Sequence, residues 1–317
     1  MLALAACGKD QQPAETTVEP EAAQPAASEQ SFEVSVDRFA DIEVLRYEVP
    51  GFDELSLQEK KLAYYLSQAA LAGRDIIYDQ NYEHNLRIRR LLSAIISTYS
   101  GDREADDFKK LAEYAKRVWF SHGIHHHYSM DKMLPEFTPE ALTAMVAQSD
   151  ATKLPLDEGQ TRGEFLDMLR PIMFDPDVAA KKVTLDPGVD QVVNSATNYY
   201  AGVTAADVEQ FYAGKVDEDP DRPVSWGLNS QLAKVDGEIV ERVWKIGGMY
   251  GPAIEKVSYW LEKASTVAEN GVQKAWIDTL VKYYKTGDLG DFDEFNIAWV
   301  ADTDSRVDAI NGFIEVY

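Results

Sequence analysis

The sequence is poor in cysteine and in basic residues. Cys7 is the only cysteine among 317 residues, which excludes an internal disulfide framework and a cysteine-based metal site. Lys and Arg number 31 against 54 Asp and Glu, so the net charge is −23. A field of this sign repels phosphate backbones, and we therefore expect no nucleic acid partner. The sequence also lacks a run of the ~18 apolar residues that a membrane-spanning helix needs.

Catalytic motifs are missing as well. A catalytic zinc site takes about three protein ligands and a general base, which typically come from a His-Glu-x-x-His helix. The sequence contains no His-Glu dipeptide, no Gly-x-Ser-x-Gly elbow and no glycine-rich loop that could cradle a phosphate. The glycine-containing segments 247–248 and 287–290 are predicted to be turns. Spacing alone thus predicts no complete active site in this chain.

Large apolar side chains are plentiful. Hydrophobic residues make up 45% of the sequence, which includes 16 Tyr, 12 Phe and 6 Trp. A chain of this length and composition can bury one large core or two modest ones. We therefore expect most of residues 32–317 to be folded.

The amino terminus has the pattern of a lipoprotein signal. Residues 4–6, Leu-Ala-Ala, precede Cys7 and Gly8 as in a lipobox, and the nearly missing upstream signal predicts that the start was placed too late. Residues 1–7 are then a truncated signal, and the proline-containing, acidic residues 8–31 are a flexible tether. A lipid on Cys7 predicts a cell-envelope location, at the outer membrane or the periplasmic face, with membrane contact only through this anchor. The alternative is a chance alanine-rich start.

Periodicity predicts a mainly helical α+β protein with a small sheet. Alternation of apolar and polar residues predicts strands, and spacing of three and four predicts helices. Strands are predicted at 32–36 and 42–49, and a hairpin at 228–246 with an Asp-Gly turn at 236–237. Helices are predicted over 56–73, 86–99, 104–120, from 138 onward, and over 204–213, 252–268 and 272–284. Residues 307–317 are predicted to be an extended or short mixed segment.

Four of the five histidines lie within six positions, at His122, His125, His126 and His127. Imidazole is a common zinc ligand, which makes a metal site one interpretation. However, Gly123 disfavours a helix here, and consecutive histidines point in different directions. Loop packing or the polarity of a ligand cleft is the other interpretation. The isolated His84 is predicted to lie on a helix surface.

Several stretches resemble bacterial members of the dipeptidyl peptidase III family, in the same order along the chain. These stretches are 64–76 (YYLSQAALAGRDI), 118–128 (VWFSHGIHHHY), 194–203 (NSATNYYAGV), 299–303 (WVADT), 307–308 (VD) and 312–317 (GFIEVY). The resemblance runs from about residue 40 to the last residue.

The resemblance implies a two-lobed zinc peptidase that removes dipeptides from the amino terminus of short peptides. In the family, a His-Glu-x-x-Gly-His motif and a later glutamate hold the zinc, and both follow the stretch that matches residues 312–317. The chain is then expected to be an incomplete lower lobe, which combines a small antiparallel β-barrel or sheet with helices. We expect it to be an amino-terminal fragment that is inactive alone, with the zinc ligands beyond Tyr317.

Two family residues have counterparts here. Glu315 matches the glutamate that binds the free amino terminus of the substrate, and Tyr317 matches the tyrosine that stabilises the tetrahedral intermediate. A carboxylate pairs with an ammonium, and a phenol donates a hydrogen bond to a developing oxyanion. Their spacing of two would put both side chains on one face of a strand. The alternative function is a non-catalytic, lipid-anchored lipoprotein that binds peptides or a divalent metal.

Overall fold

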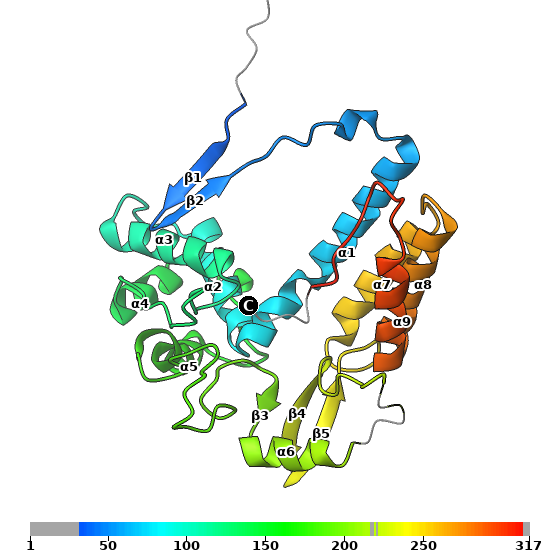
Figure 1. Ribbon diagram of the computed structural model, residues 1–317. Coiled ribbons are helices and arrows are strands. Elements are labelled where there is room, and N and C mark those ends of the chain that lie inside the picture. The colour runs from blue at the N-terminus through cyan, green and yellow to red at the C-terminus, as the bar shows by residue number, and fades with distance from the viewer. Residues whose placement is uncertain (1–31, 216–218, 220, 313–317) are drawn as a thin grey trace, which may run out of the picture. The chain divides into compact units, whose positions relative to one another are not determined.

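The computed structural model describes residues 32–215, 219 and 221–312 (Figure 1). The predicted lipidation site Cys7, the tether over 8–31 and the predicted site residues Glu315 and Tyr317 lie outside the described residues. Within the described ranges, no helix is long and apolar enough to cross a membrane.

Two compact units make up the chain. Of the described residues, 32–38 and 43–48 belong to the first, and 39–42 and those from 49 to 312 to the second. The predicted pair of amino-terminal strands is confirmed as the hairpin β1 (Ser35–Phe39) and β2 (Ile42–Leu45). In the first unit, Arg46 N donates to Val34 O at 2.7 Å, and Arg38 pairs with Glu43 at 2.9 Å.

The second unit is mainly helical, as predicted. Its helices are α1 (Leu57–Asn81), α2 (Asn85–Thr98), α3 (Asp106–Phe120), α4 (Pro139–Ala147), α5 (Arg162–Phe174), α6 (Ala205–Ala213), α7 (Gly251–Ser265), α8 (Gly271–Thr286) and α9 (Leu289–Val300). Single 3₁₀ turns lie at Phe52–Glu54 and Ala151–Lys153. Its strands are β3 (Tyr200–Ala201), β4 (Ser230–Val235) and β5 (Glu238–Val243).

Capping side chains explain why most predicted helix starts are right. Ser56 caps α1 and Thr204 caps α6, each in a reciprocal capping box with the acidic residue three positions later. The end of α1 was predicted at residue 73, but the helix continues to Asn81. Gly73 does not end the helix because it packs against α7, where a Cβ would stand 3.6 Å from Val257 Cγ2.

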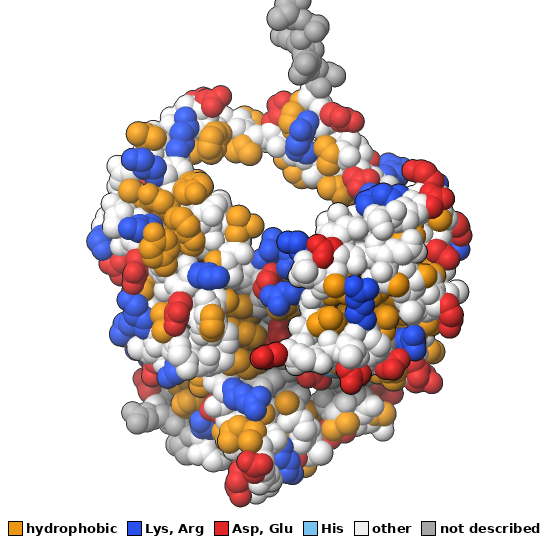
Figure 2. All heavy atoms as spheres, turned by 180° about the vertical axis from the view of Figure 1, so that it is seen from behind, with side chains coloured by type: hydrophobic (Ala, Val, Ile, Leu, Met, Phe, Trp, Pro, Cys, Tyr) orange, Lys and Arg blue, Asp and Glu red, His pale blue; other side chains and the backbone are white. Residues whose placement is uncertain are grey.

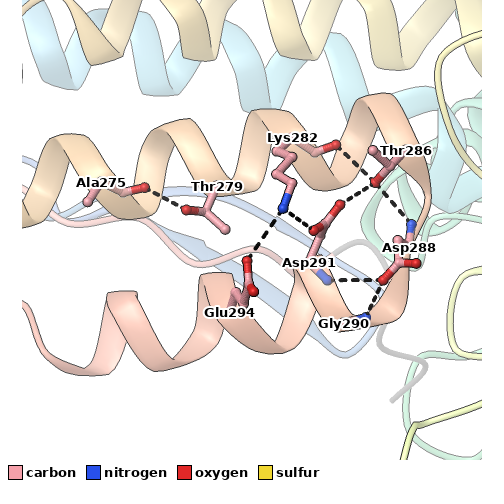
Figure 3. A network of polar contacts seen from close by, with 8 residues as sticks. All are labelled: Ala275, Thr279, Lys282, Thr286, Asp288, Gly290, Asp291 and Glu294. Carbon is pink, nitrogen blue, oxygen red and sulfur yellow. Dashed lines mark hydrogen bonds and ion pairs between the residues drawn. The ribbon is translucent and has the colours of Figure 1, made fainter.

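The helices α5 and α9 were not predicted. The segment 287–290 is only partly a turn: Gly287 ends α8 at a φ of 70°, but Gly290 already belongs to the first turn of α9. Figure 3 shows the polar contacts that close this junction. The buried carboxylate of Asp291 accepts from Thr286 Oγ1 at 2.6 Å and pairs with Lys282 Nζ at 2.6 Å. Asp288, directly after Gly287, is the N-cap of α9. The turn therefore leads straight into a helix.

Two apolar cores fill the second unit. One is formed by side chains of α2, α3, α4 and α5, among them the fully buried Leu91, Leu111 and Phe165. The other gathers α1, α7, α8 and α9, including Leu62 and Trp276, and Figure 1 shows these helices side by side. The composition predicted one large core or two modest ones, and the described residues form two.

The predicted hairpin over 228–246 is confirmed. Asp236 and Gly237 have φ values of 52° and 90°, as a two-residue turn between antiparallel strands requires. However, β4 also pairs in parallel with the short strand β3, so the sheet is mixed. The antiparallel barrel that the resemblance implied is not found in the described residues, where the order β3-β4-β5 leaves an open sheet. A two-residue strand carries too little alternation for sequence to reveal it.

Candidate functional site

The histidine loop, residues 121–133, follows α3. Its most buried ring is His125, which is only 1% exposed and whose Nε2 lies 2.7 Å from Ala179 O. Burial lowers the pKa of His125 to about 4. The ring is therefore neutral near pH 7, and its Nε2–H donates to the carbonyl of Ala179.

The other three histidines of the cluster take separate positions. His126 Nδ1 accepts from the backbone N–H groups of Tyr128 and Ser129, both at 3.1 Å. The His127 ring stacks on that of His126, with centroids 4.4 Å apart. His122 has a φ of 51° and lies 5.2 Å from the Tyr78 ring.

These positions support loop packing rather than a metal site. Among the described residues, no group of three or more His, Cys, Asp or Glu could hold a metal ion. The hydrogen bonds already occupy His125 Nε2 and His126 Nδ1, which are two of the nitrogens that a metal would need. The resemblance places the zinc ligands beyond Tyr317, outside the described residues, so the histidine loop has no part in that zinc site.

The isolated His84 does not lie on a helix surface. It occupies the N-cap position of α2 and is half-buried. Its ring contacts Tyr82 edge to face, with centroids 5.1 Å apart. The prediction was wrong because α1 ends only at Asn81 and α2 already begins at Asn85. His84 therefore lies in the short connection between the two helices.

A polar network joins the end of α1 to the sheet and to α7. Asp79 Oδ2 accepts from Asn198 Nδ2 at 2.9 Å and from the Tyr250 hydroxyl at 2.6 Å. Gln231 Nε2 donates to Asn198 Oδ1 at 2.6 Å, and Arg242 Nη1 donates to Gln231 Oε1 at 3.1 Å. We call these five residues the Asp79 network. It brings together parts of the chain that are up to 171 positions apart.

Local structure aims Tyr250 at this network. Tyr250 has a φ of 62° and stands immediately before α7, whose second residue is Pro252. Burial raises the pKa of Tyr250, and the charge of Asp79 raises it further. The hydroxyl therefore stays protonated and donates to Asp79 across the physiological pH range.

The stretch 194–203, one of those that carry the resemblance, is held by Asn198 of the network and by backbone hydrogen bonds. Asn198 N donates to Gln80 O at 2.8 Å, and Leu232 N donates to Tyr199 O at 3.0 Å. Beside it lies a polar hollow of about 450 Å³. The hollow is lined by residues 193–198 and 200–202 together with Tyr82, Glu83, Asp177, Ala179 and Ala180. Its polar lining residues, which include Glu83, Asp177 and Asn194, give it the capacity to bind hydrogen-bonding and cationic groups.

Residues 306–311, which precede the predicted site residues Glu315 and Tyr317, are held by hydrogen bonds to α8 and to the residue Glu269 shortly before it. The fully buried Gln273 donates to Val307 O at 2.8 Å, and Glu269 accepts from the backbone N–H groups of Arg306 and Val307. Further along, the Tyr284 hydroxyl donates to Asn311 Oδ1 at 2.8 Å. An apolar cavity of about 340 Å³ lies between this segment and the helices α1, α7, α8 and α9. Its lining includes residues 309–312.

The carboxy-terminal part of the chain is similar to a known peptidase family. Residues 229–317 match the family model described as Peptidase family M49, which is the dipeptidyl peptidase III family. The resemblance noted in the sequence is thus confirmed over the stretches from 299 to 317, and the match does not extend to those at 64–76, 118–128 and 194–203. No curated protein sequence matches the chain.

Two solved structures are similar to part of this chain. The structure of DPP III from Caldithrix abyssi is 16% identical with a TM-score of 0.48, over 82% of this chain and 35% of that one. The structure of dipeptidyl-peptidase III from Corallococcus sp. strain EGB is 15% identical with a TM-score of 0.47, over 83% and 35%. The chain thus matches only about a third of the length of either protein.

Sequence reasoning missed Asp79, Gln231 and Tyr250. Asn198 stood in a stretch that was singled out, but no motif or spacing pointed to its partners. The only local signal was Gly247-Gly248 before Tyr250, which predicts a turn but not the direction of a tyrosine hydroxyl.

The Asp79 network provides a matched test with two tyrosines. Both Tyr250 and Tyr199 contact Trp244, with ring centroids 5.9 and 5.7 Å away, but the buried Tyr199 hydroxyl has no hydrogen-bond partner among the described residues. Tyr250→Phe should lower the free energy of unfolding by about 1.5 to 3 kcal/mol, because it removes a hydrogen bond to a carboxylate. Tyr199→Phe should be neutral or slightly stabilising. Urea unfolding of both variants measures the difference, and equal effects would contradict the network's role.

A second prediction concerns His125 and pH. Because its folded pKa is about 4 and the unfolded value is about 6.5, the unfolded chain binds more protons between these values. The free energy of unfolding should therefore fall by about 3 kcal/mol on this account as the pH drops through that range. His125→Gln should remove this part of the decline, whereas His126→Gln, which leaves the buried ring in place, should keep it. Urea unfolding at several pH values would disprove the assignment if both variants kept the wild-type slope.

Proposed function

We propose that this chain supplies part of a zinc-dependent dipeptidyl peptidase, which releases dipeptides from the amino terminus of short peptides. The observation that carries the proposal is the match of residues 229–317 to Peptidase family M49, a range that includes Glu315 and Tyr317. In this proposal the zinc ligands belong to a part of the protein outside this chain. The chain alone is then inactive, and its role is to bind and orient the peptide.

The described residues support a binding role in two ways. Glu269, Gln273 and Tyr284 hold residues 306–311 on α8, which gives the segment preceding Glu315 a defined course. The polar hollow next to 194–203 is lined by polar residues, with the acidic Glu83 and Asp177 among them, and these suit a peptide backbone and an ammonium group. In the proposed reaction, Glu315 pairs with the ammonium of the substrate, and Tyr317 donates a hydrogen bond to the oxyanion of the intermediate.

The activity is tested on the protein purified from its source organism. A short peptide with a free amino terminus and its acetylated counterpart are incubated with the protein, with and without a zinc chelator, and the products are identified by mass spectrometry. We expect dipeptides from the free peptide only, and none after chelation. Binding of the free peptide without any cleavage would overturn the peptidase proposal in favour of a non-catalytic peptide-binding lipoprotein.

Two variants of the same protein test the assigned roles. Tyr317→Phe should lower kcat by about 10²- to 10³-fold, as expected for the loss of one oxyanion donor. Glu315→Ala should mainly raise KM for peptides with a free amino terminus, by about 10- to 100-fold, because a charge-assisted contact is lost. Kinetics that stay unchanged in both variants would refute the assignment of these residues.

We further propose that a lipid on Cys7 anchors the protein in the cell envelope. The support is the lipobox pattern of residues 4–8 followed by the proline-containing tether over 8–31. When the gene is expressed with its upstream region in the source organism, radioactive palmitate should label the wild type and leave Cys7→Ser unlabelled. Cys7→Ser should also move from the membrane to the soluble fraction. A variant that remained labelled and membrane-bound would exclude this anchor.

A further inference from the structure

Three arginines surround a single carboxylate where α1 approaches α2. Arg89 Nη1 lies 2.7 Å from Asp75 Oδ1, Arg90 Nη2 lies 3.4 Å from Asp75 Oδ2, and Arg74 Nε lies 3.5 Å from Asp75 Oδ1. We call these four residues the arginine cluster. Other ion pairs of the described residues, such as Lys215 with Glu241 or Arg306 with Glu59, match one cation with one carboxylate. In the arginine cluster, by contrast, three guanidinium groups share one carboxylate, so the four residues together carry a net charge of +2.

This excess stands out in a chain whose net charge is −23. Over the face drawn in Figure 2, Lys and Arg side chains are interspersed with Asp and Glu side chains. The positive potential of the cluster also reaches the histidine loop. Burial lowers the pKa of His122, and the charges of Lys182, Arg89 and Arg74 lower it further.

The three arginines differ in how firmly they are held. Arg89 is only 19% exposed, and its guanidinium lies over the Tyr78 ring, 5.1 Å from the centroid. It therefore has a structural role, which is to fix Asp75 and tie α1 to α2. Arg74 and Arg90 are 48% and 55% exposed and reach Asp75 only through the longer contacts. Most of their N–H donors are therefore available to solvent or to a ligand.

We propose that Arg74 and Arg90 bind a carboxylate group of a peptide. The guanidinium fork matches a planar carboxylate, and Asp75 already shows that a carboxylate fits between these side chains. A second carboxylate would reduce the net charge of the cluster from +2 to +1. This inference rests on the proposed peptide-binding function and adds to it a preference for peptides with a carboxylate at a defined distance from the polar hollow.

The position of the arginine cluster on α1 sets that distance. Asp75 and Tyr82, which lines the polar hollow, are seven residues apart on α1 or directly after it. At a rise of 1.5 Å per residue this corresponds to about 10 Å along the helix. An extended peptide covers that length in about three residues. The axial spacing therefore corresponds to a peptide of about four or five residues, which is the length we propose for the ligand.

Direct binding to this chain, measured by isothermal titration calorimetry without any turnover, tests the inference. The probes are tetraalanine, tetraalanine amide, and the amide of Ala-Ala-Glu-Ala, so the terminal and side-chain sources of a carboxylate are separated. We expect tetraalanine or the glutamate peptide to bind at least threefold more tightly than tetraalanine amide. Arg74→Gln and Arg90→Gln should each weaken that binding about three- to tenfold.

Arg306→Gln is the matched control, because it removes an equally exposed arginine whose charge is balanced by Glu59; it should leave the affinity unchanged. Equal affinity for all three peptides, or equal losses in Arg306→Gln and Arg90→Gln, would overturn the site. Because no cleavage is measured, failure of the peptidase proposal would appear separately, as absent dipeptide release with the peptide affinity intact.

Discussion

The packing of α1 against α7 is the contact on which most of the second unit depends. Gly73 of α1 faces α7, where a Cβ on the glycine would touch Val257 Cγ2 at 3.6 Å. Leu62, Leu66 and Ile76 of α1 are buried in the core that α7 and α8 complete. Because the helix is 25 residues long, its carboxy-terminal turns extend beyond this core and reach the other one. A Cβ at position 73 would meet Val257 Cγ2 at an ordinary van der Waals distance, so alanine fits there and only a side chain longer than alanine would press on Val257.

The carboxy-terminal turns of α1 connect the apolar core to the polar features of the molecule. Tyr78 donates to Trp119 O at the end of α3, and Asn81 donates to His122 O in the histidine loop. Asp79, between them, accepts from Asn198 and Tyr250. Asp79 is partly buried, and withdrawing a carboxylate from water is costly unless hydrogen bonds compensate it. The Asp79 network therefore couples the positions of β4, α7 and the stretch 194–203.

Local signals explain how much of the fold was predictable. The helix starts at Ser56, Thr138 and Thr204 follow from capping chemistry that operates within four residues, and the turn at Asp236-Gly237 follows from its backbone preference. By contrast, α9 was missed because two glycines bracket its start, and its first turn is stabilised by Asp291 through contacts with α8. The end of α1 was misplaced because packing on α7 outweighs the low helix propensity of Gly73.

In the candidate site, too, some residues could be identified from the sequence and others only from the structure. Within the range that matches the peptidase family, Glu315 and Tyr317 were identified from a short stretch of residues alone, and their roles remain predictions. The histidines drew attention because they are close in sequence, yet their rings separate into different packing environments. Asp79, Asn198 and Tyr250 carried no such signal. They form a network because α1, the sheet and α7 bring them together.

The sequence by itself determined the excess of acidic residues, the mainly helical α+β class, most helix starts, the hairpin and the resemblance to a peptidase family. These properties depend on composition and on interactions between residues a few positions apart. Only the tertiary structure decided that β3 joins β4, that three arginines share Asp75, and that Tyr250 donates to Asp79. These contacts depend on how helices and strands pack, because burial of the apolar cores fixes which distant polar groups meet.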